Sequence, residues 1–184
     1  MKKTVLVALA DGFEEIEAVT PIDVLRRAGV EVTVAGVGKD VVTGANGVKI
    51  QADLRLEDYG GLPDAVVLPG GAMGAANLRD SQAVSGLLKR MKENGRLIAA
   101  ICASPGVVLA RQGYLDGKSA TCYPGYEKNF PSSARYSAER VVGDGHLVTS
   151  RGPGTALEFS LELVRRLVDA PTADKILQAT LAKA

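Results

Sequence analysis

The sequence predicts an α/β fold in which helices cover both faces of a mostly parallel sheet. Several short runs are apolar throughout, which is the pattern of strands buried on both faces. Amphipathic segments of helical length alternate with these runs, as they do where crossover helices join parallel strands. The chain of 184 residues shows no repeat or linker, so we expect one domain, residues 1–184.

The first two elements are predicted to be a strand and a long helix. Residues 4–10 form a continuous apolar run and are expected to be a buried strand. Residues 14–28 follow as a helix, and Gly29 is a residue type that commonly ends one. Because Pro21 lies inside this helix, we expect a kink or a restart there.

The next segments continue the alternation. Residues 31–37 are rich in β-branched side chains and predict a second strand, and residues 48–52 predict a shorter one. Residues 64–68 are again a buried strand, which ends at a Pro-Gly-Gly sequence. Residues 81–93 predict an amphipathic helix, and the Asn-Gly pair after it stops the helix.

The second half of the chain begins with another buried strand at residues 97–101. A proline suits the first turn of a helix, and we expect a helix over residues 105–111. Residues 119–123 predict a further strand.

The last elements are a hairpin and two helices. Residues 140–150 predict a hairpin that turns at its Asp-Gly pair. The sequence Thr-Ala-Leu-Glu at residues 155–158 has the capping-box pattern and predicts a helix through about Val168. A final helix is expected over residues 173–183.

Composition and charge argue against a protein that binds nucleic acid, spans a membrane or holds zinc. The formal net charge is +1 without a Lys/Arg run, so neither nucleic acid nor anionic lipid is an expected partner. No apolar run approaches the ~18 residues of a membrane span. Two cysteines make no disulfide framework, which favours a reducing compartment, and we expect the protein in the cytoplasm. One histidine and two cysteines make no plausible zinc set, so no metal site is expected.

The candidate functional residues lie in four loops. Ligands of open parallel sheets bind beyond the carboxyl ends of the strands. In this chain that rule selects residues 11–17, 69–77, 102–105 and 151–155.

Cys102 is the first candidate, because it directly follows a buried strand and precedes a predicted helix start. Unpaired N–H groups at a helix N-terminus lower the pKa of a thiol and so favour the nucleophilic thiolate. The alternative is that Cys102 is a small buried hydrophobe, as most free cysteines are. Cys122 lies in a predicted strand with no helix start after it, which favours a structural role there.

A thiol nucleophile usually needs a partner that moves protons. His146 is the only histidine, and the hairpin would have to fold over the strand ends to bring it to Cys102. An ordinary strand histidine is therefore the favoured interpretation. Glu14, Glu15 and Glu17 lie in the first loop, where acidic residues also simply suit a helix N-terminus.

Glu17 differs from the other two because it begins a stripe that is otherwise apolar, with Pro21, Val24 and Ala28. A carboxyl on that interior face loses water, which raises its pKa and keeps it protonated. A neutral carboxylic acid can donate a hydrogen bond to a thiolate and then take up and return protons at carbon. Glu17 is therefore the predicted partner of Cys102.

Two glycine-containing loops complete the set. The N–H groups of Gly70 and Gly71 can face an oxyanion, and a tight turn after the strand explains this pair equally well. Residues 151–155, Arg-Gly-Pro-Gly-Thr, can bind an anion at a helix start. They do not form a dinucleotide fingerprint, because Leu157 occupies the third glycine position, and no phosphate-binding loop motif occurs elsewhere.

Taken together, these residues resemble the ThiJ/PfpI superfamily, specifically the branch of Parkinson disease protein 7 and its bacterial relatives. The resemblance covers nearly the whole chain and rests on four ordered motifs. These are Gly-Phe-Glu-Glu-Ile-Glu at 12–17, Val-Leu-Pro-Gly-Gly at 67–71, Ala-Ala-Ile-Cys-Ala at 99–103 and Thr-Ser-Arg-Gly-Pro-Gly-Thr at 149–155. The resemblance implies a flavodoxin-like sandwich and a homodimer.

The resemblance also implies roles for the candidate residues. The nucleophilic, oxidation-sensitive cysteine of the family matches Cys102, and its buried, protonated glutamate matches Glu17. The glycines that bound the thiolate site match Gly70 and Gly71.

Three further positions follow from the same resemblance. Ala103 contributes at the turn, and Arg151 matches the arginine that lines the pocket, in part across the dimer interface. Some members carry a histidine near the cysteine where this chain has Tyr123, which weakens any mechanism based on a histidine base. The peptidase branch has a histidine where Ala103 stands, so proteolysis is not expected.

The resemblance implies cofactor-independent chemistry on reactive α-oxoaldehydes, in defence against carbonyl and oxidative stress. The thiolate of Cys102 would add to methylglyoxal, Glu17 would move a proton between the two carbons, and hydrolysis would release lactate. Relatives also reverse early glycation adducts on proteins, so small reactive aldehydes and glycated proteins are both expected substrates. The alternative is a redox sensor or redox-regulated chaperone, in which Cys102 is oxidised to a sulfinate.

Overall fold

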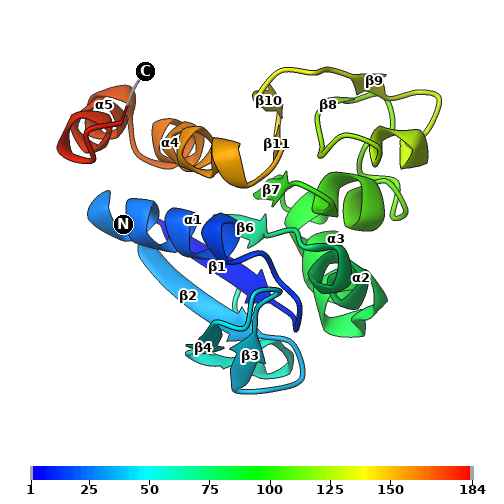
Figure 1. The fold of residues 1–184 in the computed structure, drawn as a ribbon, viewed down its shortest axis with the longest axis horizontal. Coiled ribbons are helices and arrows are strands. Elements are labelled where there is room, and N and C mark those ends of the chain that lie inside the picture. Colours follow the sequence, from blue (N-terminus) through cyan, green and yellow to red (C-terminus); the bar gives the residue numbers. More distant parts are fainter. Residues whose placement is uncertain (1, 183–184) are drawn as a thin grey trace.

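The computed structural model describes residues 2–182 and has a seven-stranded sheet between two layers of helices (Figure 1). The strand order is β10-β11-β7-β6-β1-β2-β5, and the pairs are parallel except that β10 runs antiparallel to β11. The strands of this sheet are β1 (Thr4–Leu9), β2 (Glu31–Gly36), β5 (Leu54–Arg55), β6 (Ala65–Leu68), β7 (Leu97–Ile101), β10 (Val141–Asp144) and β11 (Leu147–Ser150). The predicted α/β fold with a mostly parallel, flavodoxin-like sheet is confirmed.

The central strands are buried on both faces, which explains their unbroken apolar sequences. In β1, Val7 packs with the apolar cluster on one face, whereas Leu6 and Ala8 pack with the cluster on the other. This alternation follows from the two-residue period of a strand. Each face therefore needs its own layer of helices.

The two helical layers supply the other half of each cluster. One face is covered by α1 (Glu15–Arg27), α4 (Ala156–Leu167) and α5 (Ala170–Ala179), and the other by α2 (Ala72–Asp80) and α3 (Gln82–Glu93). Figure 1 shows α4 and α5, in orange and red, on the same side as α1. This arrangement leaves the loops at the carboxyl ends of β1, β6, β7 and β11 at one edge of the sheet.

The first helix departs from its prediction at Pro21. Helix α1 continues unbroken through the proline, so the predicted restart is wrong. Its first turn is closed by Glu14, whose side-chain Oε2 accepts a hydrogen bond of 2.8 Å from the Glu17 N–H. Packing of the helix against the sheet and α4 compensates for the single backbone bond that proline removes.

Two predicted helix starts have a different local geometry. The helix expected over residues 105–111 is a five-residue π-helix, Pro105–Leu109. The predicted capping box at Thr155 is wrong, because its hydroxyl takes a hydrogen bond from the Gly152 N–H (3.1 Å) and lies 2.7 Å from the Ser150 hydroxyl. Helix α4 nevertheless begins and ends within a residue of its predicted limits.

Several short segments differ from their predicted form. The strand expected at 48–52 is β4 (Lys49–Gln51), which pairs with β3 (Val41–Thr43) outside the main sheet. The strand expected at 119–123 is limited to β8 (Ser119–Ala120), paired with β9 (Arg135–Tyr136). The hairpin turns one residue later than predicted, at Gly145 and His146.

The last helix differs from its prediction at both ends. The last helix begins at Ala170, three residues before its predicted start, and ends at Ala179, short of its predicted end at Lys183, which itself lies outside the described residues. No helix within residues 2–182 has both the length and the apolar character needed to cross a membrane.

Candidate active site

Cys102 lies at a sharp turn directly after β7, with a backbone φ of +65°. A residue with a side chain rarely takes this left-handed conformation, which costs about 1–3 kcal/mol and persists where surrounding contacts hold it. Here the Cys102 N–H donates to the Ser150 carbonyl and the Cys102 carbonyl accepts from the Tyr123 N–H, both at 2.9 Å. Segments far apart in the sequence therefore hold the cysteine turn in place.

The turn is also tied to the loop after β6. The fully buried Ser104 hydroxyl donates to the Pro69 carbonyl at 2.5 Å. At Gly70 an added Cβ would lie 2.6 Å from the Cys102 Cβ and 2.7 Å from Glu17 Oε2. At Gly71 the backbone φ is +83°, and an added Cβ would collide with the Gly12 carbonyl oxygen. Close approach of the backbone thus requires glycine at both positions.

Glu17 is fully buried and faces the cysteine turn. Its Oε2 accepts a hydrogen bond of 2.8 Å from the Gly70 N–H, and its carboxyl shares a hydrogen bond with the Cys102 thiol. Its Oε1 is buried and has no hydrogen-bond partner among residues 2–182. Pro21 and Val24 are buried beside it, as the apolar stripe predicted.

Burial controls the ionisation of this pair. It raises the pKa of Glu17 to about 7, although the bonds from Cys102 and Gly70 act in the opposite direction. Burial and the negative charge of ionised Glu17 raise the pKa of Cys102 to about 12, and the N–H groups of Gly71 and Ala103 oppose this rise. Since the two groups interact directly, they titrate as a pair that loses its first proton near pH 7.

A helical segment begins directly after the cysteine turn, as the sequence predicted. The segment after the cysteine is a short π-helix, and the N–H groups that favour the thiolate belong to Gly71 and Ala103. The single negative charge of the pair can lie on the Glu17 carboxylate or on the Cys102 sulfur. The second arrangement requires the proton to lie on Glu17, which is the neutral acid that the sequence predicted.

Tyr123 belongs to the wall of the site, a point that the sequence left open. An added Cβ at Gly152 would lie 3.1 Å from the Tyr123 ring and 3.9 Å from Glu17 Oε1. The ring and the unpartnered oxygen of the buried carboxyl therefore both lie close to Gly152. Tyr123 keeps 47% of its surface exposed.

Three other candidates lie outside the cysteine turn. The Arg151 guanidinium donates to the Ala138 carbonyl at 3.1 Å, and its charge only partly opposes the rise in the Cys122 pKa that burial causes. Within residues 2–182 it forms no salt bridge. Cys122 is fully buried, and burial raises the pKa of its thiol to about 12. His146 lies at the amino end of β11, opposite the end that leads to Ser150.

The remaining acidic residues of the first loop have structural contacts. Glu14 caps α1, and Glu15 accepts hydrogen bonds from the Asn46 backbone N–H (2.6 Å) and side-chain amide (2.9 Å). Glu15 thereby fixes the β3–β4 hairpin to the start of α1. Of the three glutamates, Glu17 is the one that reaches Cys102.

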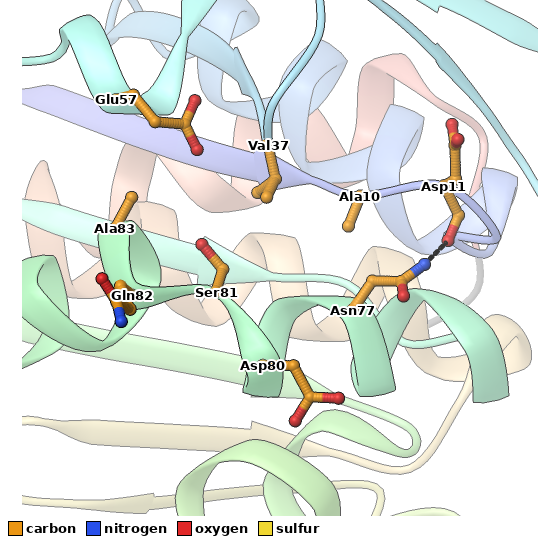
Figure 2. A pocket seen from close by; sticks show the side chains of 9 residues that line it. All are labelled: Ala10, Asp11, Val37, Glu57, Asn77, Asp80, Ser81, Gln82 and Ala83. Atoms are coloured by element: carbon orange, nitrogen blue, oxygen red, sulfur yellow. Dashed lines mark hydrogen bonds between the residues drawn. The ribbon is translucent and has the colours of Figure 1, made fainter.

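A cavity of about 510 Å³ lies at the same edge of the sheet, beyond β1 and β2 (Figure 2). Its carboxylates already have partners, since Asp11 pairs with Lys39 (2.5 Å) and Asp80 pairs with Arg79 (2.7 Å). Neither cysteine lines it. Within residues 2–182 no group of three or more His, Cys, Asp or Glu side chains could hold a metal ion.

The chain is similar over most of its length to several known proteins. The chain is 46% identical over 179 residues to the Parkinson disease protein 7 homolog of Danio rerio, covering 95% of this chain and 94% of the relative. It is 34% identical over 180 residues to the glutathione-independent glyoxalase DJR-1.2 of Caenorhabditis elegans, covering 96% and 95%. It is 42% identical to protein DJ-1 homolog A of Arabidopsis thaliana and spans 45% of the length of that protein, with 95% of this chain covered.

Comparison with solved structures relates the chain to the same group of proteins. The crystal structure of a cysteine-to-alanine mutant of a DJ-1 superfamily protein from Salmonella typhimurium superposes with a TM-score of 0.95 at 34% identity, covering 99% of this chain and 100% of the other. The model of the DJ-1/PfpI family matches residues 3–166. With the cysteine turn and the buried glutamate in place, the chain belongs to the DJ-1/PfpI family.

Proposed function

We propose that this protein converts small α-oxoaldehydes such as methylglyoxal to 2-hydroxy acids without a cofactor. The observation that carries the proposal is the fully buried Glu17 carboxyl beside the Cys102 thiol, with one oxygen bonded to Gly70 and the other unpartnered among residues 2–182. The family includes glyoxalase-type enzymes, and the C. elegans relative named a glutathione-independent glyoxalase supports this reaction class.

The reaction begins with the pair in its thiolate form. The Cys102 sulfur adds to the aldehyde carbon, a C–S bond forms, and the carbonyl oxygen takes the proton from Glu17. The Glu17 carboxylate then removes the hydrogen from that carbon as a proton, and the hydroxyl proton of the same carbon passes to the neighbouring ketone oxygen, which gives an enediolate. Return of the proton to the second carbon gives a lactate thioester, which water hydrolyses to lactate and free Cys102.

These reaction steps need no external oxidant, because the oxidation and the reduction both take place within the substrate. The aldehyde carbon is oxidised, the ketone carbon is reduced, and one water molecule is consumed. The N–H groups of Gly71 and Ala103 stabilise the sulfur anion, since they favour the ionised thiol. Glu17 must act as acid and base in one turnover, and its pKa of about 7 suits both roles at neutral pH.

The low exposure of Cys102 favours a free aldehyde over a glycated protein as the substrate. Cys102 is 9% exposed, which suits a small free aldehyde better than an adduct fixed to a folded protein surface. Deglycation of proteins would begin with the same thiol addition. We therefore assign free aldehyde as the preferred substrate.

Lactate formation from methylglyoxal in the absence of glutathione tests the proposal. The native protein should give many lactate molecules per subunit, and Cys102→Ala should give none. Cys122→Ala is the matched control, because Cys122 is a fully buried thiol outside the site, and it should retain activity if it folds. Stoichiometric loss of aldehyde without lactate would instead support a sensor that reacts once.

The role of Glu17 is tested with an isosteric pair of variants. Glu17→Gln should lower turnover by roughly 10²–10⁴-fold, because an amide cannot release and regain the proton. Glu15→Gln changes a glutamate on the same helix turn that contacts Asn46, so its turnover should stay near that of the native protein. Equal activity of Glu17→Gln and the native protein would contradict the mechanism.

A further inference from the structure

A cavity of about 190 Å³ lies at the edge of the sheet opposite Cys102, where β7 and β11 begin. Ile98 and Leu147 line it and are each 5% exposed, and the Tyr114 side chain contributes a third apolar surface. An apolar cavity of about 150 Å³ is enough to hold benzene in another protein. The volume is therefore sufficient for a phenyl ring.

Cations outnumber anions around this cavity. Lys92, Arg96 and Lys118 line it, and Asp144 is its one carboxylate among the described residues. Asp144 already accepts from the Ser119 N–H at 2.9 Å and pairs with Lys118 at 3.2 Å. The cavity thus has an apolar interior and an excess of positive charge.

The contacts of Arg96 and Lys92 leave an excess of positive charge at the cavity. Arg96 pairs with Asp64 at 2.8 Å, and Asp64 also pairs with Lys3 at 3.5 Å, so that carboxylate is shared by two cations. The Lys92 Nζ lies 5.1 Å from the centre of the Tyr114 ring. Within residues 2–182 Lys92 has no carboxylate partner. Its charge is therefore free for a ligand that also contacts the ring.

We propose that this cavity binds a small anion that carries an apolar ring, of the aromatic carboxylate class. The ring lies between Ile98, Leu147 and Tyr114, and the carboxylate contacts the ammonium groups of Lys92 and Lys118. The two features are complementary, because burial of the ring contributes affinity and the charge excess selects the anion. No covalent step is involved.

This site is separate from the thiol chemistry. Ile98 and Leu147 pair at the amino ends of β7 and β11, whereas Cys102 and Ser150 mark the opposite ends of the same strands. Occupancy of the cavity should therefore leave the rate of Cys102 alkylation unchanged.

A titration of the ¹⁵N-labelled protein with phenylacetate, followed by NMR, tests the proposal. Saturable shifts should appear at the amides of Gly95, Gly145 and Leu147, which line the cavity. Acetate has the charge without the ring and phenethylamine has the ring with the opposite charge, so both should bind more weakly. Shifts confined to the Gly70 and Gly71 amides, or equal binding of the amine and the acid, would overturn the proposal.

A matched pair of lysine variants isolates the charge. Lys92→Gln should weaken phenylacetate binding by roughly tenfold, as expected for loss of a charged hydrogen-bond donor. Lys89→Gln removes the same charge from the same helix, where the side chain is 75% exposed and does not line the cavity. It should bind phenylacetate like the native protein. If both variants weakened binding equally, the effect would come from the net charge of the protein. That result would contradict specific binding in this cavity.

Discussion

Just above neutral pH the Cys102–Glu17 pair holds one negative charge in a space from which water is excluded. The location of that charge decides reactivity, since the thiolate and not the thiol attacks an electrophile. Glu17 has the Gly70 N–H on one oxygen, and the sulfur has the N–H groups of Gly71 and Ala103. The neighbouring backbone groups therefore make both arrangements of the charge accessible.

The pH dependence of alkylation reports which atom carries the charge. If the proton stays on Glu17, the rate of iodoacetamide labelling at Cys102 should rise with an apparent pKa near 7 and then level off. If the carboxylate holds the charge, labelling should rise only toward the pKa of about 12 that the thiol then has. Cys122 is the internal reference, and mass spectrometry of the two labelled peptides measures both rates. Labelling of Cys102 no faster than of Cys122 at pH 8 contradicts the thiolate form.

The buried carboxyl also predicts how stability depends on pH. The pKa of Glu17 is about 7 in the folded protein and 4.5 in an ordinary environment, so between these values the folded state binds more protons than the unfolded state. The free energy of unfolding should therefore fall as pH rises through this window. A shift of this size corresponds to about 3 kcal/mol at most.

Urea unfolding of the native protein and of Glu17→Gln at several pH values isolates this contribution. The difference between the two free energies of unfolding should change by up to about 3 kcal/mol between pH 4.5 and 7 and stay level above pH 8. The variant removes the titrating group, so the other carboxylates cancel in the comparison. A difference that does not vary with pH would show that Glu17 ionises normally in the folded protein.

In the loop between β6 and α2, close approach of neighbouring segments limits which residues the sequence can carry. Gly70→Ala should destabilise the fold by about 1–3 kcal/mol and slow Cys102 alkylation, because the new methyl group overlaps the cysteine side chain and Glu17. Gly86→Ala is the matched control within α3, where an added Cβ meets no atom within 4 Å. It should stabilise by about 0.5–1 kcal/mol. Thermal unfolding of the two variants checks both signs.

Elements with strong periodic patterns could be predicted from the sequence, and elements that depend on distant partners could not. The strand at β1 and the helix at α3 lie within a residue of their predicted limits, because their apolar patterns reflect burial directly. Helix α2 was not predicted, since it follows two glycines and itself contains Gly74 among small residues. The Thr155 hydroxyl bonds to Gly152 and Ser150 instead of capping α4, and local sequence does not reveal that competition.

At the scale of the molecule, an exposed apolar surface near the start of α1 supports self-association. Ile16 and Val19 on α1 are 54% and 46% exposed, and Val48 in the adjacent hairpin turn is 51% exposed. The Glu15–Asn46 hydrogen bonds hold that turn beside the helix. We propose that two copies of the chain associate through this surface.

Sedimentation measures this association. The native protein should be a dimer at micromolar concentration, and Val19→Glu should shift it to monomer, because a charge in the contact would be buried without a partner. Val168→Glu is the control, since Val168 is similarly exposed at 40% and lies at the end of α4. A native monomer, or dissociation by both variants, contradicts the proposed surface.

For the candidate site too, residues marked by a local sequence pattern could be predicted, and residues placed by contacts between remote segments could not. Cys102, Glu17, Gly70 and Gly71 could be selected from strand ends and from helical spacing, and the structure brings all four together. The position of Tyr123 depends on a hydrogen bond between backbone segments that are remote in sequence, so no local pattern could reveal it.

The left-handed turn at Cys102 is held by the Ser150 carbonyl, which the ribosome adds later than the cysteine itself. A growing chain that already carries Cys102 but not β11 lacks this acceptor, and β7 lacks its neighbour on that side. Its thiol then has the ordinary chemistry of a cysteine in an unfolded peptide. The left-handed geometry of Cys102 therefore forms only after translation has passed β11, the last parallel strand.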